Sequence, residues 1–298
     1  MSPESMQRIC SLDDPRVAPY RSLRDRTLRG ESLFVAEGRL LVLRLLQSDY
    51  RAESVFVADP WADEFRPLVP DHVPMYVAAE SLLLQVVGFK FHRGVLAVGR
   101  RPAPVPLDAL LAAIERPENT AGPVAEAERE RAAAAERSDT PRPTRSALRL
   151  VICPEVTKPE NLGLVFRAAA AFGVHDVLLG ERCCDPLSRR SLRVSMGAVL
   201  GMPWARSADL LADLRQLRDR WGVTLLAAVL DPQAERLAES SWPPRAAVLL
   251  GNETDGLRQQ YLALCDRRLT IPMHPGTDSL NLGVAAGVFL YEMTRRRG

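Results

Sequence analysis

The stretch LRLVICPEVTKPENLGLVFRAAAAFGVHDVLLG (residues 148–180) decides the fold class. It opens with a strand-like apolar run (148–156), continues with apolar residues at helical spacing (161–173), and closes with a second strand-like run (174–180). A strand–helix–strand order of this length is typical of a βαβ unit, in which the two strands lie parallel in one sheet. The segment therefore predicts an α/β domain.

Further βα units follow this segment. Residues 209–222 have the pattern of an amphipathic helix, and residues 223–230 and 246–251 are continuous apolar runs of the kind found in buried parallel strands. Helical patterns over 256–265 and at the end of the chain complete the series. Repeated βα units predict a parallel sheet with helices on both faces, which binds its ligands outside the carboxyl ends of the strands.

The N-terminal part of the chain has its own alternating pattern, which predicts a small α/β module. Expected helices cover residues 37–48 and 79–88, and expected strands cover residues 54–59, 73–78 and 94–99. The region after Pro102 is rich in Ala, Glu, Arg and Pro and offers no apolar face to bury. We therefore expect three parts: an N-terminal domain over 1–101, a flexible linker over 102–146, and a second domain over 147–298.

The overall composition limits the class of protein. Of the 298 residues, 47% are apolar and 26% are charged, which is typical of a globular chain, and no apolar run reaches membrane-spanning length. The start of the sequence lacks the apolar core of a secretory signal. The five cysteines show no disulfide framework and no metal-ligand spacing. We expect a cytoplasmic protein with reduced thiols, no metal and no membrane anchor.

Polar residues collect after the predicted strand at 148–156. Pro159 and Asn161 suit a helix start, and Arg167 lies off the apolar stripe of that helix, beside Gly163 and Ala170. Small neighbours leave room for a phosphate or a ribose to approach the guanidinium. The alternative is a surface arginine paired with an acidic residue.

Two further clusters follow later strands. GNETDGL (251–257) places Glu253 between two glycines whose backbone amides can approach a ligand, although a plain turn before a helix has the same pattern. LTIPMHPGTDSLN (269–281) leads into the last helix, for which we expect Asp278 or Ser279 to be the N-cap residue. An ordinary packed terminal helix is the alternative for this cluster.

Several familiar sites are not signalled. The sequence has no GxxxxGK[ST] phosphate loop, no GxGxxG after a strand, no HExxH, and no complete nucleophile elbow around RVSMG (193–197). These absences argue against a Walker NTPase, a dinucleotide-binding fold, a zinc protease and an α/β-hydrolase.

Taken together, the three clusters resemble the three motifs of the SpoU (TrmH-like) family of RNA 2′-O-ribose methyltransferases. Motif one is NLGLVFRAAAAFG, motif two is LLGNETDGL, and motif three is IPMHPGTDSLNLGVAAGVFLYE. The resemblance covers residues 148–298. Less sharply, FVAEGRLLVLRLLQSD and FHRGVLAVGR resemble the substrate-binding domain that precedes the catalytic domain in many members.

The resemblance implies an α/β fold whose C-terminal domain is a trefoil-knotted parallel sheet, with a small N-terminal α/β RNA-binding domain. It also implies a homodimer that binds S-adenosylmethionine in the knot. The positions that match the methyl-donor site are Val229, Gly251, Asn252, Ile271, Met273 and Leu280.

The same resemblance implies that the ribose 2′-hydroxyl attacks the donor methyl group. The matching residues are Asn161, Arg167, Glu253, Ser279 and Asn281. An arginine is ordinarily too weak an acid to serve as a base, so we expect Arg167 to position a phosphate and stabilise the developing alkoxide. Glu253 is expected to order its loop. Gly283 departs from the family pattern, which often has a hydroxyl residue at this place.

The RNA partner, tRNA or rRNA, is expected to contact basic residues of the N-terminal domain, unless these form only a solvated basic face. The candidates are Arg21, Arg24, Arg26, Lys90, His92 and Arg93. Two other functions stay open at this point. One is a catalytically inactive RNA-binding relative, and the other is a methyltransferase that acts on a small molecule or a protein.

Overall fold

The computed structural model describes residues 6–21, 32–88, 94–114, 148–174, 176–274, 276 and 279–295. These residues form two compact units. The first contains the described residues up to Ala103 together with Leu187–Gly201, and the second contains the other described residues. Segment 187–201 therefore groups with the N-terminal unit, although the sequence assigns it to a continuous domain over 147–298.

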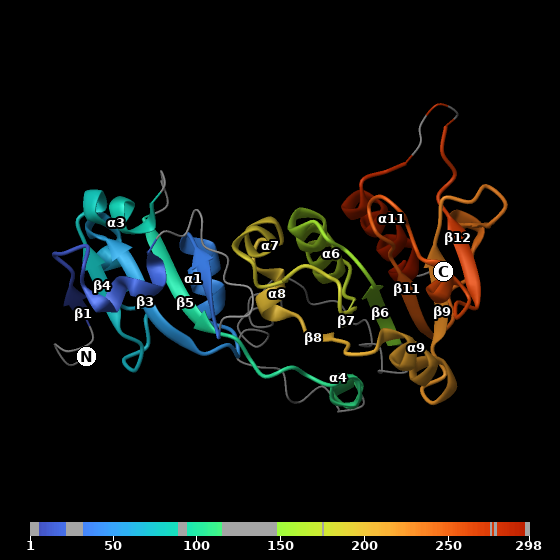
Figure 1. The fold of residues 1–298 in the computed structure, drawn as a ribbon, viewed down its shortest axis with the longest axis horizontal. Helices are drawn as coiled ribbons and strands as arrows, with labels where there is room; N and C mark the ends of the chain where they lie inside the picture. The colour runs from blue at the N-terminus through green and yellow to red at the C-terminus, as the bar shows by residue number, and fades with distance from the viewer. Residues whose placement is uncertain are drawn as a thin grey trace, which may run out of the picture. The chain divides into compact units, whose positions relative to one another are not determined.

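The first unit is built on a mixed sheet with the strand order β1-β4-β3-β5-β2 (Figure 1). Strands β1, β4 and β3 are parallel to one another, whereas β5 is antiparallel to both β3 and β2. The elements of this unit are β1 (Met6–Arg8), η1 (Pro15–Tyr20), β2 (Leu33–Glu37), α1 (Arg39–Leu46), β3 (Ala52–Ala58), η2 (Asp59–Trp61), α2 (Ala62–Phe65), β4 (Met75–Ala78), α3 (Glu80–Val87), β5 (Val95–Arg100), α7 (Arg189–Val194) and α8 (Ala198–Gly201).

The second unit contains a sheet with the order β10-β12-β9-β11-β6-β7-β8, in which every described strand pair is parallel. Its elements are α4 (Leu107–Ile114), β6 (Leu148–Cys153), α6 (Pro159–Ala171), β7 (Asp176–Leu179), β8 (Trp204–Arg206), α9 (Leu210–Asp219), β9 (Thr224–Ala228), β10 (Glu235–Arg236), η4 (Leu237–Glu239), β11 (Arg245–Leu249), α10 (Gln259–Leu262), β12 (Arg267–Thr270) and α11 (Leu282–Thr294). The predicted α/β class with a parallel sheet is confirmed. The trefoil knot stays a prediction.

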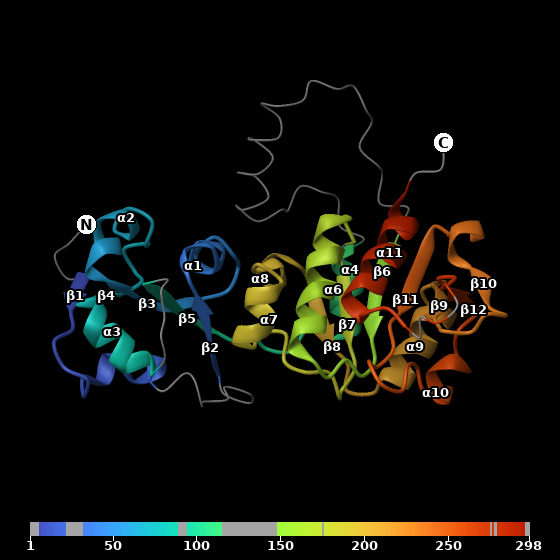
Figure 2. The ribbon, with the colours of Figure 1, turned by 90° about the horizontal axis from the view of Figure 1, so that it is seen from above.

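Helices cover both faces of this sheet, as the buried strand runs predict. Helices α6 and α11 lie together on one face, and α4 and α9 lie on the other (Figures 1 and 2). Alternate residues of the strands point to opposite faces. Leu150 and Ile152 of β6, for example, join the cluster under α4 and α9, while Val151 between them is fully buried on the other side.

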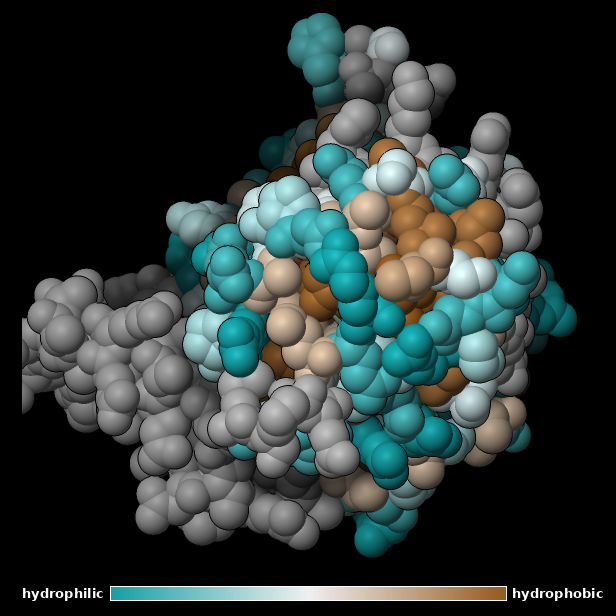
Figure 3. Space-filling view, turned by 90° about the vertical axis from the view of Figure 1, so that its left-hand side faces the viewer, coloured by the Kyte–Doolittle hydropathy of each residue, from teal (hydrophilic) through white to brown (hydrophobic). Residues whose placement is uncertain are grey.

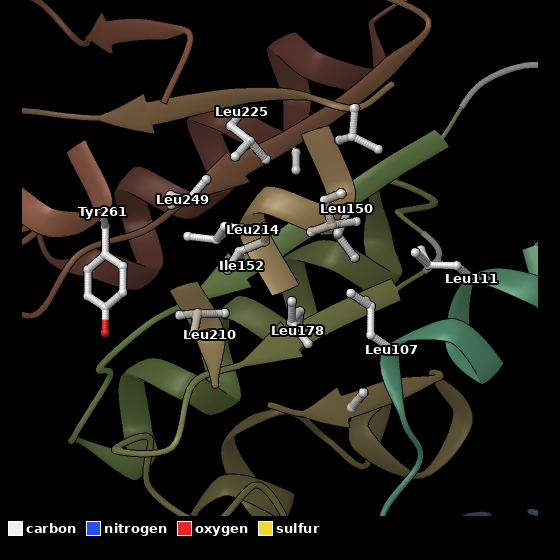
Figure 4. Packing of buried hydrophobic residues seen from close by; sticks show 14 of the residues in the cluster. Leu107, Leu111, Leu150, Ile152, Leu178, Leu210, Leu214, Leu225, Leu249 and Tyr261 are labelled. Atoms are coloured by element: carbon white, nitrogen blue, oxygen red, sulfur yellow. The ribbon is translucent and has the colours of Figure 1, made fainter. Parts of the chain in front are cut away.

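Helix α4 corrects the predicted linker. Its residues Leu107, Leu110 and Leu111 are buried, and they belong to the same apolar cluster as Leu150 and Leu178 of the sheet (Figure 4). The Ala- and Pro-rich composition of the range 102–146 obscures an apolar face at its start, and this face packs on the sheet. Residues 115–146 of the predicted linker lie outside the described residues.

Candidate functional site

The first motif forms helix α6, and its first turn points a buried amide toward the second motif. Lys158 is the N-cap residue in an extended conformation, Pro159 follows at the first helical position, and Gly173 ends the segment with a φ of 69°. The predicted apolar stripe is buried except for its last residue, Phe172, which is partly exposed. Asn161 does not cap the helix, and its side chain, only 4% exposed, is available for tertiary hydrogen bonds.

Three polar side chains from the three motifs form one hydrogen-bonded chain. Asn161 donates from Nδ2 to Oε1 of Glu253 over 2.9 Å, and its own Oδ1 accepts a hydrogen bond of 2.9 Å from Nδ2 of Asn281. These residues are 92 and 120 positions apart from Asn161 along the sequence. The structure therefore brings together three of the five predicted catalytic residues.

The Glu253 carboxylate is held by several donors. Besides the Asn161 amide, it accepts hydrogen bonds from the backbone amide of Lys158 at 3.2 Å and from the Thr157 hydroxyl at 3.3 Å. Partial burial raises the pKa of Glu253, but these hydrogen bonds favour the charged form and outweigh it, so the pKa lies below its ordinary value. Glu253 is a fixed anion here, which suits the predicted role of ordering the loop.

The loop that carries Glu253 is tightly closed. Asn252 and Gly256 exchange two backbone hydrogen bonds, of 2.8 and 3.1 Å, and Gly256 has a φ of 67°. A Cβ atom on Gly251 would lie 2.4 Å from the carbonyl carbon of Gly256, so any larger residue would push the two backbone segments apart. The start and the end of this loop are therefore in close backbone contact, and its role in donor binding stays a prediction.

The third motif begins helix α11, and its cap differs from the prediction. Asn281 is the N-cap residue, because its Oδ1 accepts a 2.9 Å hydrogen bond from the backbone amide of Gly283. Asp278 and Ser279 had been expected in this role. Asn281 is favoured as the N-cap residue because its side-chain amide makes two hydrogen bonds at once. Its oxygen accepts from the helix backbone while its nitrogen donates to Asn161. Ser279 is exposed, and Asp278 lies outside the described residues.

Residues predicted to bind the methyl donor lie where the strands of the second unit end. Val229 follows β9, Ile271 and Met273 follow β12, and Leu280 precedes α11; all four are partly exposed. Gly251 and Asn252 follow β11, next to β9 in the sheet. Partly exposed apolar side chains suit contact with the adenosine part of S-adenosylmethionine. Their individual roles stay predictions.

Arg167 is not part of the hydrogen-bonded chain. It lies two turns further along α6, is exposed, and has no hydrogen bond or ion pair with another residue that the structure describes. The alternative of an arginine paired with an acidic residue thus finds no partner in this part of the chain. An exposed guanidinium with no partner among the described residues is available to a substrate or to a second subunit.

Only one predicted RNA contact can be located. Arg21 donates from a terminal guanidinium nitrogen to the carbonyl oxygen of Asp14 at 3.0 Å. One of its donors is therefore used within the η1 segment. Arg24, Arg26, Lys90, His92 and Arg93 lie outside the described residues. Figure 3 shows hydrophilic residues around a hydrophobic area on one face. The first unit exposes the large apolar side chains of Met6, Leu12, Leu40 and Leu68. These RNA contacts stay predictions.

No group of three or more His, Cys, Asp or Glu side chains among the described residues is placed to hold a metal ion. No helix formed by these residues has the length and apolar character needed to cross a membrane.

Sequence reasoning missed residues that support the site. Thr157 and Lys158 hold Glu253, and the buried carboxylate of Glu155 pairs with Arg258. A signal for Glu155 was present, because a charged residue directly after a buried strand needs a partner. Nothing in the sequence indicated which arginine would supply it.

Comparison with known proteins places the chain among RNA methylases. A model described as the SpoU rRNA Methylase family matches residues 148–291. A Mycobacterium bovis protein described as an uncharacterized tRNA/rRNA methyltransferase is 35% identical over 299 residues, covering 97% of this chain and 92% of that protein. A 23S rRNA (guanosine-2′-O-)-methyltransferase of Salmonella typhimurium is 33% identical over 150 residues, covering 50% of this chain and 60% of that protein.

Solved structures share the fold over the length of the chain. The AdoMet-bound rRNA methyltransferase of Sinorhizobium meliloti has a TM-score of 0.72 at 23% identity, covering 97% of both chains. The SpoU methyltransferase AviRb of Streptomyces viridochromogenes, in complex with AdoMet, has a TM-score of 0.70 at 22% identity, covering 94% of this chain and 98% of that one. At these identities the likeness shows the fold.

Proposed function

The chain belongs to the SpoU rRNA methylase family, as its motifs predict, and from this premise we propose that it methylates a ribose 2′-hydroxyl in structured RNA, tRNA or rRNA. S-adenosylmethionine is the methyl donor in this proposal. The observation that carries it is the hydrogen-bonded chain Asn281–Asn161–Glu253, which joins all three family motifs at the carboxyl edge of the sheet. The Salmonella typhimurium relative named above, a guanosine-2′-O-methyltransferase, supports the ribose as the target.

S-adenosylmethionine supplies an electrophilic methyl group on a sulfonium sulfur. The ribose oxygen forms a bond to this methyl carbon as the carbon–sulfur bond breaks, and the hydroxyl proton leaves to a phosphate oxygen or to water. The products are a 2′-O-methylated ribose and S-adenosylhomocysteine. The protein contributes by aligning the two reactants and by stabilising the charge that develops on oxygen.

Arg167 is the residue we propose to act on the RNA. A guanidinium can hold a phosphate with two parallel hydrogen bonds and stabilise the nascent alkoxide. Its exposure and its lack of a partner among the described residues fit this role. Ser279, also exposed, lies at the entrance to α11, where its hydroxyl can hydrogen-bond with the donor or the ribose.

The other polar residues position groups. Glu253 is held as an anion by the 157–161 segment, so it fixes the loop whose backbone faces the donor. Asn161 also accepts a hydrogen bond from Asn281, so it connects Glu253 to the start of α11. Asn281 caps this helix, which follows the proposed donor-binding residue Leu280. A shift of the loop therefore reaches the start of α11.

A homodimer is part of the proposal. Helix α11 exposes Val284, Val288 and Tyr291, which are 52%, 38% and 50% exposed and lie at positions i, i+4 and i+7. This spacing forms one apolar face on a helix that also carries the third motif. Association of two copies through this face would bury it and bring Arg167 of α6, the helix packed on α11, near a second subunit.

We place the protein in the cytoplasm, where its RNA substrate is found.

Methyl transfer to purified RNA tests the function. The protein is incubated with methyl-labelled S-adenosylmethionine and either bulk tRNA or rRNA. Label in one RNA class, in dinucleotides that resist alkaline cleavage, is expected, because a 2′-O-methyl group blocks attack by the 2′-oxygen. Donor binding with no transfer to either RNA would contradict the proposal and favour a small molecule or a protein as the substrate. Absence of donor binding would favour an inactive RNA-binding relative.

A further inference from the structure

The carboxylate of Glu155 is buried at the carboxyl edge of the sheet, and the proposed reaction does not use it. Glu155 follows β6 and is only 7% exposed. A buried carboxylate is unfavourable unless cations or hydrogen-bond donors compensate for the lost water. Its partners therefore show which parts of the structure it holds together.

Those partners come from the ends of both neighbouring strands. Arg258, which follows the β11 loop and is the N-cap residue of α10, forms an ion pair with Glu155 in which Nε lies 2.7 Å from Oε2. Arg182, after β7, lies 3.6 Å from Oε1. The backbone carbonyl of Glu155 accepts a 2.9 Å hydrogen bond from the side-chain amide of Asn252. One residue thus links three strand ends.

The links to the β11 loop are placed at its two ends. Asn252 begins the loop, and its Oδ1 also accepts the backbone amide of Thr254 at 2.8 Å, while Arg258 lies two residues beyond Gly256. Glu253 between them is held separately by Asn161. Loss of the ion pair with Arg258 would leave the loop attached through Glu253 and through the hydrogen bond from Asn252 to the backbone carbonyl of Glu155. The far end of the loop, which closes on Asn252 through Gly256, would then be free to shift.

We propose that Glu155 is a positioning residue for S-adenosylmethionine: through Arg258 and Asn252 it holds the 251–258 loop in the shape that binds the donor. This inference rests on the proposed function, in which Gly251 and Asn252 contact the donor through their backbone. A preformed loop loses little conformational entropy when the donor binds. The link to Arg258 therefore affects donor affinity and leaves RNA affinity unchanged.

The test measures the dissociation constant of S-adenosylmethionine by calorimetry, and the KM values for donor and RNA, in the full chain. Glu155→Gln and Arg258→Met are each expected to weaken donor binding about tenfold, with the KM for RNA and kcat within about twofold of wild type. Each substitution removes the same ion pair between Glu155 and Arg258. The double variant is therefore expected to bind the donor about as weakly as each single variant. Arg258→Lys, which keeps the cation, is expected to recover most of the affinity.

Glu181→Gln is the matched control. Glu181 lies in the same unit and accepts the backbone amide of Leu210 at 2.9 Å, so its loss is expected to lower the melting temperature without changing donor affinity. If the wild type binds the donor and both Glu155→Gln and Arg258→Met bind it equally well, this inference is overturned and the proposed function is not. An equal loss in Glu181→Gln overturns it too, because the effect would then be general destabilisation. A wild-type protein that does not bind the donor overturns the proposed function as well.

Discussion

Gly283 of α11 lies directly against Leu164 of α6: a Cβ atom on the glycine would be 2.4 Å from Cβ and 2.6 Å from Cδ1 of the leucine. Real Cβ atoms do not approach other atoms so closely, and both neighbours belong to packed helices. The glycine that departs from the pattern of the family is thus matched by a leucine across the helix contact. The two helices carry motifs one and three, so this pair sets how closely the two motifs approach.

Gly283→Ala is expected to destabilise the protein by about 1–3 kcal/mol, because an added methyl group in a packed contact forces the helices apart. Urea unfolding followed by circular dichroism measures this change. Gly287→Ala is the matched control on the same helix, since a Cβ there meets nothing within 4 Å. The control should be neutral or more stable by up to about 1 kcal/mol, as alanine favours a helix. Equal effects of the two substitutions would contradict the pairing of Gly283 with Leu164.

Asn281→Ser separates capping from catalysis. Serine is a good N-cap residue, so the free energy of unfolding should change by less than about 1 kcal/mol. Serine is too short to replace the hydrogen bond to Asn161, and methyl transfer should fall roughly tenfold or more, since positioning is lost. Thermal unfolding and a methyl-transfer assay on the same preparation test both parts. Full activity in a stable Asn281→Ser protein would exclude a role for the chain Asn281–Asn161–Glu253 in positioning.

Glu253 predicts a pH dependence of stability. Its pKa in the folded protein lies below the ordinary value of 4.5, so the folded state binds this proton less readily than the unfolded chain. The stabilisation is therefore fully present above pH 4.5 and is lost as the pH falls through the lower folded-state pKa. Glu253→Gln should lower stability at pH 7, with the difference from wild type shrinking below pH 4.5.

Urea midpoints at pH 7, 5 and 4 measure this difference. Glu239→Gln serves as the control, since Glu239 is an exposed carboxylate in the same unit, paired only across 3.5 Å with Arg236. A difference between wild type and Glu253→Gln that stays constant down to pH 4 would show that the charge of Glu253 contributes nothing to stability.

Val288→Arg tests the proposed dimer face. A charged residue in the middle of the exposed apolar face of α11 is expected to prevent association, because burying an unpaired guanidinium is unfavourable. Light scattering after gel filtration should show a monomer. A thermal unfolding curve should show that each chain is still folded. Leu40→Arg, at an exposed leucine of the first unit, should leave the dimer intact. A wild-type monomer at micromolar concentration would refute the dimer.

The sequence predicted the parts of the fold that depend on local patterns. The segment 148–180 forms β6, α6 and β7 as its alternating pattern indicates, and the apolar runs at 223–230 and 246–251 became the central strands β9 and β11. The meeting of the three motifs was also predictable, because the carboxyl ends of parallel strands share one edge.

The rest depended on tertiary contacts that a linear pattern does not contain. Helix α4 packs on the sheet although its neighbourhood is compositionally biased, and segment 187–201 groups with the first unit through contacts such as the ion pair of Arg189 with Glu37. Asn281 replaces the predicted caps because Asn161 offers it a second hydrogen bond. The partner of Glu155 likewise appears only once Arg258 is brought to the end of β6.

The most direct test of the central claim is the nucleoside composition of RNA treated with wild type or Arg167→Ala, measured by mass spectrometry after complete digestion. Wild type with S-adenosylmethionine should produce one 2′-O-methylnucleoside, methylated on the ribose and not on the base. Arg167→Ala should keep the melting temperature, since Arg167 is exposed and has no partner among the described residues, yet lose at least about a hundredfold in product. A methyl group on a base, or full activity in Arg167→Ala, would contradict ribose methylation by this site.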